Sequence, residues 1–264
     1  MIYMKFDGYL ICSDHDGTVA EWGELLQVNI EAIKYFQDNG GIFTVATGRR
    51  HDFVAEKYAG IIKPHVPCII SNGTMLYDIT DDKVIYKNFL TVDDYDVLFD
   101  AFEHSQHALR FRIELEEESL WFDIDKTCID DINKALNGRE VSKFVMEFKN
   151  EDEDKTLELQ KYLTDKYGDR YTVVRAWYTG LEFFTKTGGK GDCISRVKEI
   201  IKDTLGIEIH TVIGMGDFEN DISLIKMADI GVAMGNAPMH VKEHADKIAE
   251  KSADGGFAKF VYSL

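Results

Sequence analysis

Two aspartates separated by one residue lie near the start of the chain, in the segment Asp14-His15-Asp16-Gly17-Thr18. Carboxylates at this spacing can serve a metal ion and a proton transfer together. Asp14 is then a candidate nucleophile, and Asp16 a candidate general acid that later acts as the base. Gly17 allows the backbone to turn sharply beside them. Taken alone, the segment also fits a turn or a helix cap, which Asp and Thr favour.

A second acidic segment reads Gly214-Met215-Gly216-Asp217-Phe218-Glu219-Asn220-Asp221. Asp217 and Asp221 are four residues apart, which places both on one face where a helix begins. Their oxygen ligands suit Mg²⁺. The alternative interpretation is that these residues only cap the helix and face solvent.

Three other motifs are excluded by spacing. An EF-hand loop that started at Asp14 would need Gly and Glu at its sixth and twelfth positions, but Gly17 comes too early and Leu25 stands where Glu is required. A Walker A loop needs Ser or Thr where Gly191 follows the lysine. A dinucleotide fingerprint needs Gly at the position of Glu219.

Two further polar groups complete a candidate site for phosphoryl chemistry. Thr47 follows a short apolar run, and its hydroxyl can donate to a phosphoryl oxygen, although Thr47-Gly48-Arg49 also fits a simple turn. Lys190 precedes a predicted helix and can neutralise charge on a transferring phosphoryl group. The alternative for Lys190 is a solvated surface lysine.

Together these residues predict a metal site. Phosphoryl transfer requires in-line positioning and neutralisation of a dianion. Several carboxylates beside a phosphate dianion would repel it by roughly several kcal/mol at intermediate dielectric. A divalent cation together with Lys190 resolves this conflict, so the carboxylates themselves predict the cation.

The elements around these residues read as strand, turn, helix and strand, which is typical of a parallel sheet. Short apolar runs predict strands buried on both faces. In such sheets the ligand site forms beyond the carboxyl ends of the strands. We therefore predict an α/β fold with a Rossmann-like parallel sheet. The predicted strands are 9–12, 42–46, 68–70, 210–213 and 230–234, and the predicted helices are 29–38, 192–205 and one that begins near residue 220.

The middle of the chain has a different pattern. Its strands alternate between apolar and polar residues, which indicates an antiparallel sheet with one covered face. We therefore predict a core domain of residues 1–85 and 186–264, interrupted by an inserted α+β domain at 86–185. The predicted helices of the insertion are 92–104 and 152–167, and its predicted strands are 109–115, 119–124, 143–148, 171–177 and 181–185.

Composition limits the partners. The net charge of −17 and the pI of about 4.8 disfavour binding to nucleic acid or to anionic membranes. No apolar run approaches the roughly 20 residues needed to span a bilayer, and no signal peptide is recognised. Cys12, Cys68, Cys128 and Cys193 are far apart, which disfavours a zinc site or a disulfide framework. We expect a reduced, cytoplasmic enzyme.

With these residues in view, the chain resembles the haloacid dehalogenase superfamily of phosphohydrolases, and within it the Cof-type branch with a type IIB cap. The resemblance covers nearly the full length. The segments around Asp14, Thr47, Lys190 and Asp217 match the four motifs of the family, and Val232–Ala237 and Asp254–Ala258 are similar to this branch.

The resemblance implies that Asp14 forms the phosphoenzyme. It also implies Mg²⁺ held by Asp14, by the backbone carbonyl of Asp16 and by Asp217. Asn220 and Asp221 would hold the waters or the geometry of the metal, or would position Lys190.

Substrate-binding candidates are Gly48, Arg49, Asn72 and Gly73 beside the strand ends, together with Glu182 in the insertion. Trp177 and Tyr178 are interpreted as packing residues.

The predicted function is Mg²⁺-dependent hydrolysis of small phosphate monoesters, such as sugar phosphates, through an aspartyl-phosphate. Two alternatives remain: a phosphomutase or phosphotransferase that uses the same adduct, and a non-catalytic protein that binds a phosphorylated metabolite. We expect a small phosphorylated metabolite as the ligand and a monomer or homodimer.

Overall fold

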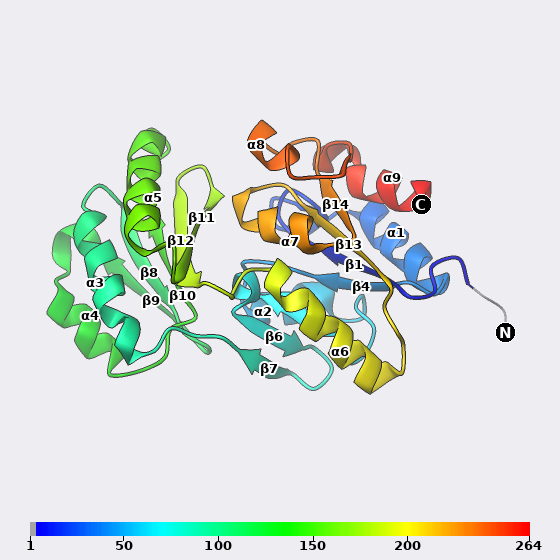
Figure 1. The fold of residues 1–264 in the computed structure, drawn as a ribbon, viewed down its shortest axis with the longest axis horizontal. Helices are drawn as coiled ribbons and strands as arrows, with labels where there is room; N and C mark the ends of the chain where they lie inside the picture. The colour runs from blue at the N-terminus through cyan, green and yellow to red at the C-terminus, as the bar shows by residue number, and fades with distance from the viewer. Residues whose placement is uncertain (1–3) are drawn as a thin grey trace. The chain divides into compact units, whose positions relative to one another are not determined.

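The computed structural model describes residues 4–264, and the chain forms two compact units. One unit comprises the chain up to Tyr86 together with Gly189–Leu264, and the other is Lys87–Gly188. We call them the core and the cap. Both are shown in Figure 1. The predicted boundaries at 85/86 and 185/186 differ from these by one and three residues.

The core is built on a five-stranded parallel sheet in the order β15-β14-β13-β1-β4. Each strand is short and mostly buried, because helices and loops cover it. The α/β fold with a parallel core sheet is as predicted. The strands are β1 (Tyr9–Ser13), β4 (Ile42–Val45), β13 (Thr211–Gly216), β14 (Ile230–Ala233) and β15 (Lys247–Ile248).

Helices and two small antiparallel sheets surround this sheet. Helix α1 packs against α9, and α7 lies along β13 and β14. The helices are α1 (Gln27–Asp38), α2 (His51–Tyr58), α6 (Ile194–Leu205), α7 (Ile222–Met227), α8 (Met239–Lys242) and α9 (Gly256–Ser263). The further strands are the pair β2 (Ala20–Glu21) and β3 (Glu24–Leu25), and the trio β5 (Cys68–Ile70), β6 (Met75–Asp78) and β7 (Lys83–Lys87).

The cap contains an antiparallel sheet in the order β11-β12-β10-β8-β9. Its three helices lie on one face of that sheet (Figure 1). Phe111, Phe144 and Phe183 form a row of contacting rings on adjacent strands within the cap's buried core. The strands are β8 (Arg110–Glu114), β9 (Ser119–Asp123), β10 (Lys143–Glu147), β11 (Tyr171–Trp177) and β12 (Gly180–Thr185), and the helices are α3 (Tyr95–His104), α4 (Ile129–Leu136) and α5 (Glu153–Tyr167).

Two side-chain bonds explain why the cap extends beyond its last strand. Thr185 Oγ1 donates to the carbonyl of Asn88 at 3.2 Å, and Asn88 Nδ2 lies 3.1 Å from Thr187 Oγ1. The outgoing segment is therefore tied to the incoming one. The interpretation of Trp177 and Tyr178 as packing residues is only partly right, since they are 38% and 53% exposed at a hairpin turn.

The four cysteines agree with the prediction of a reduced protein. Cys12, Cys68 and Cys193 are buried, Cys128 is exposed, and all four are free thiols. Within residues 4–264, no helix combines the length and apolar character needed to cross a bilayer.

Candidate active site

Three strands of the core sheet deliver the predicted chemical groups to one edge. Asp14 directly follows β1, Thr47 lies two residues after β4, and Asp217 directly follows β13. Because β1 pairs in parallel with both β4 and β13, their carboxyl ends meet. The backbone N–H of Asp14 donates to the Met215 carbonyl at 2.8 Å, which extends the register to the site.

Lys190 lies at the centre of the acidic residues. Its side chain is fully buried, and its Nζ is 2.5 Å from Oδ1 of Asp14 and 2.5 Å from Oδ1 of Asp221. Asp14, Asp217 and Asp221 each offer a carboxylate oxygen, and these atoms lie within 4.8 Å of one another. The structure therefore brings together Asp14, Lys190, Asp217 and Asp221, which are distant in sequence.

The electrostatics of this group require additional positive charge. Burial raises the pKa of Asp14 well above its ordinary value, Asp221 acts in the same direction, and Lys190 opposes both. Burial, helped by Asp221, also raises the pKa of Asp217 to about 7. Burial would lower the pKa of Lys190, but Asp14 and Asp221 outweigh it and hold that pKa above its ordinary value.

The same group fits a divalent cation. Three ionised carboxylates and one ammonium leave a net charge of −2 in a buried place. A nucleophilic Asp14 must be ionised, and burial opposes this. Carboxylate oxygens are the ligands that Mg²⁺ prefers, so charge and donor type both fit that ion.

Asp221 has a well-defined structural part in the cluster. Its Oδ2 accepts the backbone N–H groups of Asp217 and Phe218 at 2.9 and 3.1 Å, while its Oδ1 accepts from Lys190. Gly216 leaves space for it, since a Cβ there would lie 2.3 Å from the Asp221 Cβ. Asp221 thus orders both the loop after β13 and the lysine.

Asn236 was not among the predicted site residues, yet it contacts the cluster. Its Nδ2 lies 2.9 Å from Oδ2 of Asp217 and 2.9 Å from the carbonyl of Gly17, so it links the two acidic loops. Its Oδ1 accepts the backbone N–H of Ser252 at 3.0 Å. The available signal was its position three residues after β14, at the same edge of the sheet.

Thr47 and Asn72 are buried next to each other. The backbone N–H of Asn72 donates to the Thr47 carbonyl at 2.9 Å. Thr47 Oγ1 accepts from the Arg49 N–H at 3.1 Å, which leaves the hydroxyl proton available for a phosphoryl oxygen. Asn220 Nδ2 donates to Asn72 Oδ1 at 3.2 Å, so Asn220 connects the loop after β13 to Asn72. Gly73 accepts a bond from the Cys193 thiol through its carbonyl.

Asp16 is paired with Arg49. The guanidinium donates through Nε to Oδ2 at 2.9 Å and through Nη2 to Oδ1 at 3.1 Å. Burial would raise the pKa of Asp16, but the bonds and the charge of Arg49 outweigh it and hold the pKa below its ordinary value. Gly48, between Thr47 and Arg49, is half-buried.

Glu182 belongs to the cap, on β12. Its Oε1 accepts from Lys143 Nζ at 2.8 Å, and both side chains are almost fully buried. Lys143 Nζ also lies 3.8 Å from Oε2 of Glu114, and Arg112 Nη2 lies 3.2 Å from Oε1 of the same residue. Glu182 is therefore one end of a chain of alternating charges across three cap strands.

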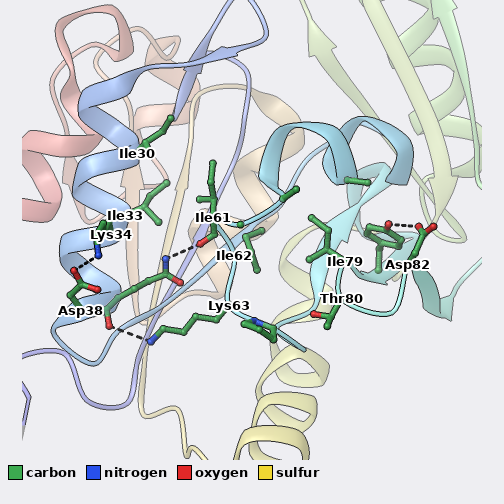
Figure 2. Close-up of a pocket in the computed structure, with 16 residues that line it drawn as sticks. Ile30, Ile33, Lys34, Asp38, Ile61, Ile62, Lys63, Ile79, Thr80 and Asp82 are labelled. Carbon is green, nitrogen blue, oxygen red and sulfur yellow. Dashed lines mark hydrogen bonds and ion pairs between the residues drawn. The ribbon is translucent and has the colours of Figure 1, made fainter.

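A cavity of about 750 Å³ in the core is a separate feature (Figure 2). It is lined by the second half of α1, the loop after α2 and the β6–β7 turn. Lys63 donates there to the carbonyls of Gln37 and Gly41 at 3.2 and 3.1 Å. None of the candidate catalytic residues lines the cavity, because α1 and α2 end at the opposite edge of the sheet from the carboxyl ends of the strands.

Comparisons with known proteins agree with this geometry. The chain is 28% identical over 254 residues to a 5-amino-6-(5-phospho-D-ribitylamino)uracil phosphatase of Bacillus subtilis, covering 96% of this chain and 94% of that protein. It is 25% identical to the pyridoxal phosphate phosphatase YbhA of Escherichia coli, covering 96% and 97% of the two chains.

Solved structures show the same fold at low identity. A sugar phosphatase of HAD subclass IIB has a TM-score of 0.77 at 20% identity and covers 97% of this chain and 98% of its own. A haloacid dehalogenase-like hydrolase from B. subtilis has a TM-score of 0.74 at 19% identity and covers 97% and 99%. The predicted fold class, the family resemblance and the assignment as an enzyme are confirmed. Residues 11–261 match the family described as haloacid dehalogenase-like hydrolase, and this chain belongs to that family.

Proposed function

We propose that this enzyme is a Mg²⁺-dependent phosphatase that hydrolyses small phosphate monoesters through an aspartyl-phosphate on Asp14. The observation that carries the proposal is the buried Lys190 ammonium, which lies 2.5 Å from both Asp14 and Asp221 beside the third carboxylate, Asp217. This arrangement concentrates a nucleophile, a fixed cation and a candidate cation site at one sheet edge. The relatives named as phosphatases support the same reaction class.

In the first step, a carboxylate oxygen of Asp14 attacks phosphorus and the bond between phosphorus and the ester oxygen breaks. The leaving alkoxide takes a proton from Asp16. Thr47 donates its hydroxyl to a phosphoryl oxygen, and Lys190 compensates the charge on Asp14 and the phosphoryl group. A bound Mg²⁺, held by Asp14, Asp217 and the Asp16 carbonyl, would supply further positive charge to the phosphoryl oxygens.

In the second step, water attacks the phosphorus of the aspartyl-phosphate and gives its proton to the Asp16 carboxylate. The bond between phosphorus and Asp14 breaks, which releases inorganic phosphate and restores both acids. Transfer to a sugar hydroxyl instead of water would make the enzyme a phosphotransferase, with the same adduct and a different acceptor.

The pairing of Asp16 with Arg49 has to change during this cycle. A general acid must hold its proton, and Arg49 favours the ionised form of Asp16. A phosphate dianion is a strong partner for a guanidinium. A substrate that draws Arg49 to its phosphate would therefore release Asp16 and raise its pKa towards the value that an acid needs.

The substrates named for the relatives guide the choice of compounds. We propose that this enzyme acts on small metabolites such as sugar phosphates, pyridoxal phosphate or a phosphoribityl compound, within the cytoplasm. Phosphate release from such a panel, with and without Mg²⁺, tests the proposal. We expect turnover by the wild type and a loss of at least about 10⁴-fold in Asp14→Asn. Folded wild-type protein that hydrolyses no member of a broad panel would contradict the proposal.

A further inference from the structure

The β2–β3 hairpin holds the most exposed large apolar side chain in the part of the chain that the structure describes. Trp22 is 98% exposed at the tip of this hairpin. The pairs Ala20↔Leu25 and Glu21↔Glu24 leave Trp22 and Gly23 as a two-residue turn. A large indole in full contact with water gains nothing for folding, because it buries no apolar area.

The backbone of Trp22 is also unfavourable for that side chain. Its φ is 51°, in the left-handed region, and Gly23 follows at 81°. Two-residue turns with two positive φ angles favour Asn-Gly, and a bulky residue at the first position is an outlier. Folding therefore favours Asn at this position, and the indole requires another explanation.

The hairpin is attached firmly to the catalytic loop. The N–H of Gly17 donates to the Ala20 carbonyl at 2.9 Å, and the N–H of Ala20 donates to the His15 carbonyl at 2.9 Å. Lys57 Nζ binds Glu24 at 2.8 Å from α2. The tip is two residues beyond Ala20, or roughly 7 Å of extended chain.

His15 fixes the tip itself. Its Nε2 lies 3.3 Å from the Gly23 carbonyl, which can only accept, so this nitrogen carries the proton. Its Nδ1 then accepts from the hydroxyl of Tyr58 at 2.7 Å. His15 lies between the nucleophile and the acid in sequence, and its ring is buried. The residue that separates the two catalytic aspartates thus also holds the turn that presents Trp22.

We infer that Trp22 is a specificity-determining residue whose indole stacks on a flat ring in the leaving group of the phosphate ester. The inference rests on the proposed function and adds the class of leaving group. A rigid indole beside the reacting phosphate favours planar partners, because aromatic pairs gain energy in stacked or edge-to-face contact. Acyclic esters gain no such contact.

The test uses the full chain and two primary alkyl esters, pyridoxine 5′-phosphate and glycerol 3-phosphate. Their bonds to phosphorus are alike, so the ring is the main difference. Trp22→Asn creates the favoured Asn-Gly turn and should keep or raise the melting temperature. We expect the ratio of the two kcat/KM values, ring ester over acyclic ester, to fall about tenfold in Trp22→Asn. Trp22→Phe should retain most of it.

A binding measurement separates this inference from the proposed function. In the Asp14→Asn background, pyridoxine 5′-phosphate should change the tryptophan fluorescence, and Trp22→Asn should remove that change although two of the three tryptophans remain. Turnover of both esters with an unchanged ratio in Trp22→Asn overturns the inference and leaves the phosphatase proposal intact. Fluorescence change without turnover in the wild type does the reverse. A ring ester that leaves the fluorescence of Trp22 unaltered overturns the inference.

Discussion

The Arg49 guanidinium and the Asp16 carboxylate form a two-pronged ion pair, with one guanidinium nitrogen on each carboxylate oxygen. The pair joins the loop after β4 to the loop after β1. It holds the proposed acid in its ionised form, and it occupies the cation best placed to receive a phosphate. The resting arrangement therefore keeps both residues in store until a substrate separates them.

Arg49→Ala should weaken substrate binding. A hydrogen bond to a charged group contributes about 1.5–3 kcal/mol, which corresponds to a KM about 10- to 100-fold higher. Arg49→Lys keeps the charge but loses the two-pronged geometry, so its KM should lie between the two. Steady-state kinetics on one ester measures this. A fall in kcat at constant KM would show that Arg49 does not bind the ground-state phosphate.

Mg²⁺ should stabilise the folded protein. The cation offsets the net charge of −2 among the buried groups, so it binds the native state in preference to the unfolded chain. At about 100 times its Kd, a ligand adds about 2.7 kcal/mol, which is a rise of several degrees in melting temperature. Asp217→Asn should reduce this rise. Thermal unfolding in EDTA, in Mg²⁺ and in NaCl of equal ionic strength provides the comparison. An equal rise in NaCl would show general screening.

Gly17→Ala should impair Mg²⁺ activation, and Gly206→Ala should not. Both glycines have positive φ, 73° and 67°, so alanine strains the backbone at either position by about 1 kcal/mol. A Cβ at Gly17 would lie 2.3 Å from Oδ2 of Asp217, whereas nothing lies within 4 Å of one at Gly206. The concentration of Mg²⁺ for half-maximal activity should rise only in Gly17→Ala. Similar Mg²⁺ curves for both variants would place Asp217 outside the metal site.

Asp100→Asn should destabilise the cap at neutral pH. Asp100 accepts from Lys166 at 2.9 Å, Tyr167 at 3.0 Å and Tyr162 at 3.1 Å, and so ties α3 to α5. Burial would raise its pKa, but these bonds outweigh burial and hold the pKa below its ordinary value. We expect a loss of about 1–3 kcal/mol at pH 7.

The pH dependence has a definite sign. A carboxyl with a lowered native pKa stabilises the fold above its unfolded pKa of about 4, and this contribution is lost as pH falls through the native value. The difference between wild type and Asp100→Asn should therefore shrink below about pH 4. Denaturant unfolding across pH measures it, with the exposed Glu103→Gln on the same helix as the control. A difference that stays constant with pH would rule out the ionised carboxylate as its source.

The sequence predicted the elements that have a strong period. Buried runs such as 68–70 coincide with strands, and the amphipathic run at 152–167 is helix α5 from Glu153 to Tyr167. The convergence of Asp14 and Asp217 was also predictable, because parallel strands place their carboxyl ends together. Local pattern and sheet topology agree at these places.

Other elements had weak local signals. Helix α4 is preceded by Cys128, which accepts the N3 backbone N–H in a capping box with Asp131 although Cys is not a usual cap. The β2–β3 hairpin depends on a Trp-Gly turn in place of Asn-Gly. Asn236 reaches Asp217 through tertiary packing alone. These features depend on neighbours that are distant in sequence, which periodicity does not report.

The order of the core strands has a consequence for the newborn chain. β1 pairs on one side with β4, but on the other side with β13, so that Tyr9 lies opposite Thr211. Chains leave the ribosome from the N-terminus onwards, and the whole of Lys87–Gly188 is made before β13. The cap strands pair only with one another, so the cap has all its partners first. Until β13 emerges, one edge of β1 has no mate and invites association with other chains. Asp14, made among the first residues, gains its catalytic partners only near the end of synthesis.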